Sequence, residues 1–314
     1  MKNKTKSLLL ITAAAAAGMY VYNRYISDIA DEMNQEDEKN GSFYSWKEGE
    51  IFYKKIGTGK PILLVHDLDS ASSSNEWQKL ARKLSTTHTV YMIDLLGCGK
   101  SDKPAISYTT YLYVQLVTSF IKDVIQEKTD VIATHLSTPF IIMANQMDSE
   151  IMDKIILINP VSMKQTELIP DQISKLKKAI INLPLVGTFL YHRINTPIKM
   201  NLHLETKCFK NADHISTSMR NSFYSSAHSK NGQGKYLFSS ILGNFLCQDM
   251  KHALKNMNKP VLIIASNDLH ENSKIIEGYE KLNSQFSSIY LSGTKLYPHL
   301  EYPDKVLKIL ETKL

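Results

Sequence analysis

The sequence predicts an α/β protein built on a mostly parallel sheet that is flanked by helices. Its 314 residues are 43% hydrophobic and 22% charged, an ordinary composition for a chain that buries a large core. From residue 43 onward, short apolar segments alternate with longer helical patterns, which is typical of a doubly wound parallel sheet. Residues 130–144 show the pattern most clearly, because they predict a buried strand, a tight turn and a returning helix.

The first 27 residues are expected to form an anchor or signal segment. An apolar run from Leu8 to Tyr22 follows three lysines, at positions 2, 4 and 6. This run favours a membrane anchor, although about 15 residues is short of the roughly 20 that span a bilayer. A cleaved signal peptide and a helix packed on the domain are the alternatives. The lysines before the run predict an inside N-terminus and an extracytoplasmic domain.

Residues 28–42 are acidic, end in Lys-Asn-Gly-Ser, and predict a solvated linker. The domain then covers residues 43–314. Its strands are expected, in chain order, at Phe43–Trp46, Ile51–Ile56, Pro61–His66, Thr89–Asp94, Asp130–Ala133, Lys154–Asn159, Pro260–Ser266 and Ser288–Ser292. Helical patterns lie between the later strands, at Asn75–Leu84, Tyr111–Glu127 and Lys274–Leu282.

Residues 161–257 interrupt the alternation and predict a helical cap inserted between the sixth and seventh strands. Helices are expected there around Asp171–Asn182, Pro184–Tyr191, Ala212–Tyr224 and Tyr236–Leu246. The insertion holds thirteen Lys and Arg against five Asp and Glu. A solvated basic surface and a surface resting on anionic lipid both account for this charge. A cap also implies a pocket beneath it for a small apolar ligand or substrate.

Three segments resemble motifs of the α/β-hydrolase superfamily. Gly57-Thr-Gly-Lys-Pro-Ile-Leu-Leu-Val-His-Asp67 is similar to its strand and oxyanion loop, and Asp94-Leu-Leu-Gly-Cys-Gly-Lys-Ser-Asp-Lys-Pro104 to the loop after the following strand. Pro298-His-Leu-Glu-Tyr-Pro303 is similar to the segment after the last strand. The subgroup resembled comprises capped esterases, haloalkane dehalogenases, epoxide hydrolases and proline iminopeptidases. The resemblance implies an eight-stranded α/β-hydrolase fold with a cap.

The catalytic triad that the resemblance implies is degenerate. In a nucleophile elbow, small residues lie two before and two after the turn residue; here Ala133 and Ser137 place His135 at the turn. Asp268 follows the seventh strand at the acid position, where a helix-capping turn residue is the other interpretation. Within Lys295-Leu-Tyr-Pro-His299, the catalytic histidine's position falls on Leu296.

The oxyanion loop is altered as well. Its donors would be the backbone amides of Leu68 and Leu136, which do not depend on side-chain identity. Asp67 follows His66 where the superfamily has glycine, and a carboxylate pointing inward would oppose a developing oxyanion. We expect Asp67 to point outward, as a turn residue.

The sequence therefore predicts a membrane-associated α/β-hydrolase-fold protein that is either a pseudoenzyme or a weak, non-standard hydrolase. The alternative is an active serine-type hydrolase of small esters or amides, for instance with Ser137, His299 and Asp268 as a shifted triad, although capping a helix is the more natural role of Ser137. Neither cofactor nor metal is expected, since the Cys and His spacing matches no ligand motif. Nucleic acid is not an expected partner, and the oligomeric state is not predicted.

Overall fold

The computed structural model describes residues 2–38 and 41–314. Eight strands form one sheet in the order β1-β2-β4-β3-β5-β6-β7-β8, in which β1 and β2 are antiparallel additions to a parallel core. The strands are β1 (Ser42–Trp46), β2 (Gly49–Ile56), β3 (Lys60–Val65), β4 (His88–Ile93), β5 (Thr129–Thr134), β6 (Met152–Ile158), β7 (Val261–Ser266) and β8 (Phe286–Leu291). All eight strand predictions are confirmed, with small shifts at their ends.

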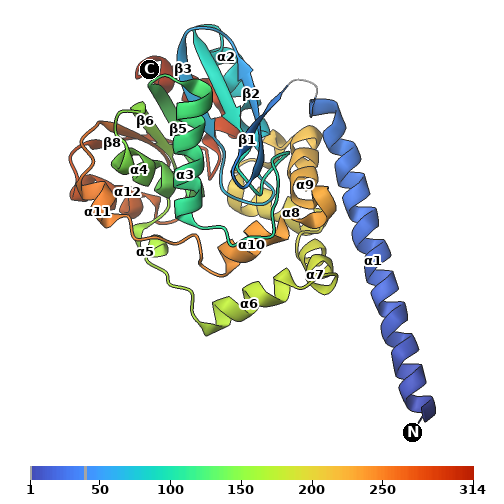
Figure 1. Cartoon of the computed structure of the whole chain (residues 1–314). Coiled ribbons are helices and arrows are strands. Elements are labelled where there is room, and N and C mark those ends of the chain that lie inside the picture. Colours follow the sequence, from blue (N-terminus) through green and yellow to red (C-terminus); the bar gives the residue numbers. More distant parts are fainter. Residues whose placement is uncertain (1, 39–40) are drawn as a thin grey trace.

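Helices cover both faces of this sheet (Figure 1). One face packs against α3 (Thr110–Phe120), α4 (Thr138–Met147), α11 (Lys251–Lys255) and α12 (Asn272–Leu282). The other packs against α2 (Gln78–Leu84) and α14 (Pro303–Glu311). The central strands β3, β5 and β7 consist almost wholly of buried residues, because both of their faces are covered.

A helical insertion separates β6 from β7. It contains α5 (Met163–Thr166), α6 (Gln172–Asn182), α7 (Val186–Ile194), α8 (Pro197–His203), α9 (Thr217–Gly232), α10 (Lys235–Leu242) and the α11 already described. Short 3-10 or π turns join some of these helices, among them η4 (Leu204–Cys208) and η5 (Ala212–His214). A smaller hydrophobic cluster, around Phe209 and Phe223, joins the insertion to Tyr297 and Leu300 near the C-terminus.

The N-terminal helix α1 (Lys2–Glu38) is much longer than the predicted apolar segment. The prediction of a linker over residues 28–42 is wrong for residues 28–38, which continue this helix, and for Ser42, which begins β1. Residues 39 and 40 lie outside the described residues. The helix persists because its second half packs on α9, where Asn23, Ser27 and Ala30 are buried.

The first half of α1 leaves the body of the molecule, and its side chains from Thr5 to Tyr22 are exposed or half-exposed (Figure 1). Within the described residues, one helical segment, Thr5–Asn34, is both long enough and apolar enough to cross a membrane.

Candidate functional site

His135 lies at the turn between β5 and α4. Its φ of +40° is a left-handed backbone angle that side-chain-bearing residues rarely adopt. The Thr138 hydroxyl donates to the His135 carbonyl at 2.6 Å, which closes the turn before α4 continues. The structure thus places histidine on the strained elbow where a hydrolase of this fold presents its nucleophile.

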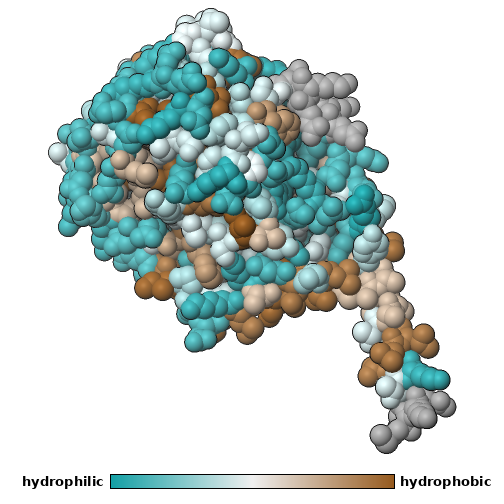
Figure 2. All heavy atoms as spheres, viewed as in Figure 1, coloured by the Kyte–Doolittle hydropathy of each residue, from teal (hydrophilic) through white to brown (hydrophobic). Residues whose placement is uncertain are grey.

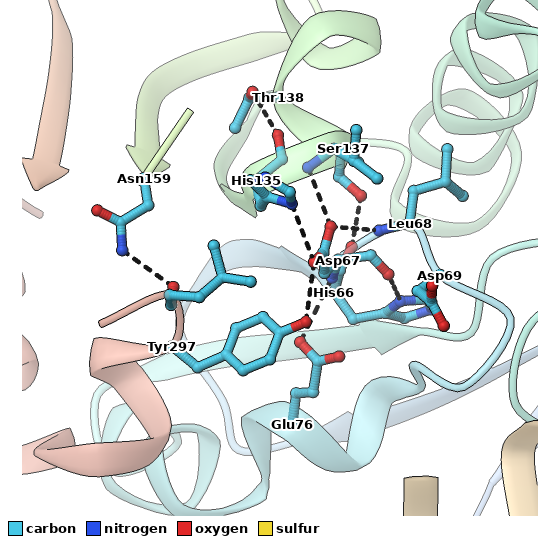
Figure 3. A network of polar contacts seen from close by, with 12 residues as sticks. His66, Asp67, Leu68, Asp69, Glu76, His135, Ser137, Thr138, Asn159 and Tyr297 are labelled. Atoms are coloured by element: carbon cyan, nitrogen blue, oxygen red, sulfur yellow. Dashed lines mark hydrogen bonds and ion pairs between the residues drawn. The ribbon is translucent and has the colours of Figure 1, made fainter. Parts of the chain in front are cut away.

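Asp67 follows β3 and points inward, so the expectation that it would point outward is wrong. Its Oδ1 accepts the backbone N–H groups of Leu68 at 2.8 Å and Leu136 at 2.9 Å (Figure 3). These are the two amides that the sequence nominates as oxyanion-hole donors. Oriented amides attract negative charge, and in this chain they hold a carboxylate of the protein itself.

The other Asp67 oxygen completes the network. Oδ2 accepts the Tyr297 hydroxyl at 2.9 Å and lies 3.2 Å from His135 Nδ1. Four donors therefore converge on one carboxylate that is almost completely buried.

This arrangement favours a charged pair. Burial alone would raise the pKa of Asp67, but the His135 charge and the hydrogen bonds from His135, Tyr297 and Leu136 hold it below its ordinary value. Burial alone would likewise lower the pKa of His135, yet the charge and hydrogen bond of Asp67 raise it. Both shifts thus favour the charged form of each partner.

Asp268, at the predicted acid position, lies apart from this network in the turn after β7. Its Oδ1 pairs with Lys210 Nζ of the insertion at 2.8 Å, and its Oδ2 accepts the Gly293 N–H at 2.8 Å. The Lys210 hydrogen bond and then the Gly293 bond hold the pKa of Asp268 below its ordinary value. A lysine thus pairs with Asp268 where a triad would require histidine.

Leu296, at the predicted histidine position, is half-buried against the cluster around Phe209 and Phe223. Its carbonyl accepts the Asn159 side-chain N–H at 2.9 Å, which fixes the backbone of this loop. The side chain at this position has no group that can accept a proton.

A second buried acid and imidazole, Glu76 and His299, lie beside the Asp67 network. Glu76 Oε2 accepts the Asp67 N–H at 3.3 Å and lies 3.7 Å from His299 Nε2. Burial raises the pKa of Glu76 to about 8 and lowers that of His299 to about 3, so both groups are neutral near pH 7. The imidazole stacks on Trp77, with ring centroids 4.4 Å apart.

The shifted triad of Ser137, His299 and Asp268 is not assembled. The Ser137 hydroxyl is buried and donates to the His66 carbonyl. Asp268 pairs with Lys210, and His299 lies against Glu76 and Trp77. Among the described residues, no group of three or more His, Cys, Asp or Glu side chains is arranged to hold a metal ion.

Sequence reasoning missed Tyr297 and Glu76 as members of this site. Tyr297 directly follows Leu296, so a hydroxyl next to the lost histidine was a signal that could have been used. Glu76 carried no comparable signal, because only folding brings η1 (Ser74–Trp77) against the turn after β3.

Comparisons with known proteins agree with the fold. Residues 60–179 match the family described as alpha/beta hydrolase fold. A serine hydrolase involved in carbazole degradation has a TM-score of 0.70 at 16% identity, covering 87% of this chain and 97% of that one. A membrane phospholipase A described as a bacterial virulence factor has a TM-score of 0.66 at 18% identity, covering 99% of this chain and 97% of that one.

An uncharacterized protein of Mycobacterium tuberculosis is 25% identical over 139 residues, which are 43% of this chain and 40% of that protein. This chain thus aligns with less than half the length of that curated relative. At these identities the structural likeness shows the shared fold.

Proposed function

We propose that this chain, which has the α/β-hydrolase fold, lacks standard serine-type hydrolysis, is attached to a membrane and serves to bind a small ligand or partner. One observation carries the proposal: the Asp67 carboxylate accepts both backbone amides of the oxyanion-hole position. The protein's own negative charge lies where a substrate's oxyanion would develop.

Acyl transfer of the usual kind needs a nucleophile, a base that takes its proton, and free amide donors. His135 replaces the nucleophile and is itself paired with Asp67. Leu296 replaces the base, and Asp268 at the acid position forms an ion pair with Lys210. Each change alone weakens hydrolysis, and together they argue for a binding role.

A cleft between α1, α9 and η1 offers space for a ligand, with a volume of about 780 Å³. Most of its lining side chains are polar, and the apolar part of the lining comes from Ile29, Met33, Ala71, Met219, Phe223 and Leu300. Glu76 belongs to the lining as well, and its Oε1 is buried without a hydrogen-bond partner. The ligand that we propose for this cleft is a small molecule with both polar and apolar groups.

Attachment to the membrane is proposed to be through α1. The buried side chains of Asn23, Ser27 and Ala30 support an uncleaved helix, since cleavage near residue 27 would remove part of this packing. The exposed apolar half of α1 supports insertion into lipid. By the distribution of lysines, the body of the protein would be extracytoplasmic. Retention of the full-length chain in membranes after an alkaline wash is the expected result, and its release would refute the anchor.

The test of the catalytic proposal uses the full chain in mild detergent, incubated with a fluorophosphonate probe and, separately, with short-chain p-nitrophenyl esters. We expect no covalent labelling and no turnover from protein whose folding is verified by circular dichroism. Labelling that maps to one serine, together with ester turnover, would overturn the proposal in favour of the active serine-type hydrolase. Loss of that labelling in Ser137→Ala would then identify the shifted nucleophile.

A further inference from the structure

Helix α6 carries an apolar face that the rest of the described chain leaves open. Ile173, Leu176 and Ile180 are 63%, 60% and 40% exposed. Their spacing of three and four residues places them on one side of the helix. The opposite side, with Ser174, Lys178 and Ile181, is buried against the body.

The apolar surface extends beyond the helix at both ends. The exposed apolar residues of this segment are Leu168, Ile169, Ile173, Leu176, Ile180, Leu183 and Val186. We call residues 168–186 the α6 surface. Figure 2 shows apolar residues gathered along the edge of the body over α6 and α7, continuous with the apolar half of α1. Contiguous apolar surface of this kind marks contact with another phase or partner.

The α6 surface and the start of α7 contact α1 at the end of its apolar run. The rings of Tyr22 and Phe189 are 5.3 Å apart, and the Asn23 side chain donates to the Leu185 carbonyl at 3.0 Å. Tyr22 ends the apolar run of α1, and Asn23 is its first buried residue. The α6–α7 connection therefore lies where α1 would emerge from the lipid.

We propose that the α6 surface is a second membrane contact, which rests in the lipid–water interface beside the point where α1 enters the bilayer. We infer that the α6 surface contacts lipid, because its apolar side chains are continuous with those of the proposed anchor. Lys175 and Lys177 are exposed beside the apolar face, as in helices that lie in an interface among anionic headgroups. The proposal rests on the proposed function insofar as α1 inserts.

The test measures lipid contact at single positions of the full chain. Leu176→Cys, Leu10→Cys and Met147→Cys are each made in a Cys247→Ser background, because Cys98 and Cys208 are buried. All three positions are exposed, and Met147 ends α4, a helix that packs on the sheet rather than in the insertion. Each variant carries an environment-sensitive fluorophore and is reconstituted into vesicles of phosphatidylcholine and phosphatidylglycerol that contain a nitroxide-labelled lipid.

We expect loss of fluorescence at positions 10 and 176 and none at position 147. Quenching at 10 alone overturns the second contact while the anchor stands. Quenching at 176 alone refutes the anchor but supports the α6 surface, and quenching at neither refutes both. Equal quenching at 147 would mean unspecific adsorption and would also overturn the proposal. Excimer emission from pyrene at position 176 would assign the surface to a second copy of the chain instead.

Discussion

Asp67 with His135, and Glu76 with His299, are neighbouring carboxyl–imidazole pairs that ionise in opposite ways. In the first, the pKa of the acid is lowered and that of the imidazole is raised, so both shifts favour the charged forms. In the second, the pKa of the acid is raised to about 8 and that of the imidazole is lowered to about 3, so both are neutral.

The difference lies in the donors around each acid. Asp67 accepts four hydrogen bonds, two of them from backbone amides, whereas the backbone donor to Glu76 is a single amide at 3.3 Å. Burial penalises the charged form of both acids, and only Asp67 has enough donors to overcome that penalty. The comparison teaches that the oxyanion-hole amides still stabilise negative charge here, but that this charge belongs to the protein.

Removing the charged pair should have the largest effect. We expect Asp67→Ala to lower the free energy of unfolding by about 3–5 kcal/mol, because the His135 ring and three further donors lose their buried acceptor. Denaturant unfolding measures this, and NMR titration should show the pKa of His135 falling. Asp268→Ala is the matched control, since it removes a carboxylate that is only partly buried. Equal losses of unfolding free energy in the two variants would contradict the stabilising role of the Asp67 network.

The neutral pair predicts a pH dependence. The pKa of Glu76 is about 8 in the folded protein against an ordinary 4.5, so the folded state binds the extra proton between these values. This contribution to stability is complete below about pH 4.5 and is lost as the pH rises to about 8, with a slope of up to about 1.4 kcal/mol per pH unit.

Glu76→Gln should remove this slope, because glutamine keeps the shape of the protonated acid but cannot lose the proton. The test measures the free energy of unfolding of the wild-type protein and of Glu76→Gln by denaturant at several pH values between 5 and 8. The difference between the two proteins at each pH isolates the contribution of Glu76. Parallel pH profiles would mean that Glu76 is already ionised in the folded protein.

A smaller change probes one donor to the charged pair. Tyr297→Phe should cost about 1.5–3 kcal/mol of stability, because its hydroxyl bonds an ionised carboxylate. Tyr113→Phe is the control, since that buried hydroxyl bonds the neutral Leu96 carbonyl at 2.8 Å and should cost about 0.5–1.5 kcal/mol. If the two substitutions cost the same, Asp67 would not carry its charge.

The sequence predicted the sheet well because every strand is short and contains apolar residues, and turn residues separate many of the strands from the next element. The position of the elbow could also be predicted from the sequence, since Ala133 and Ser137 flank His135. The linker prediction failed because acidic residues 28–38 continue α1, which packs on α9, and composition does not reveal that partner.

The direction of Asp67 was beyond local reasoning. A carboxylate after a strand ordinarily favours a solvated turn, and the donors that draw it inward come from Leu136 and Tyr297. These residues are far along the chain and meet Asp67 only in the folded sheet. The substitutions at the triad positions could be identified from the sequence. The hydrogen-bond network around Asp67 could not.

The smallest signal is expected from restoring the residues that the superfamily uses. The double variant His135→Ser with Leu296→His should remain unlabelled by fluorophosphonate, because Asp67 still occupies the Leu68 and Leu136 amides. Adding Asp67→Gly frees both donors, and slow labelling at position 135 should appear. Removal of one such donor costs about 10²–10³ in rate in working hydrolases, so the triple variant should label faster by at least that order. Mass spectrometry of the labelled peptide measures the rates. Equal labelling of the double and triple variants would show that Asp67 does not block the hole, whereas a gain confined to the triple variant would tie the loss of hydrolysis to the carboxylate as well as to the triad.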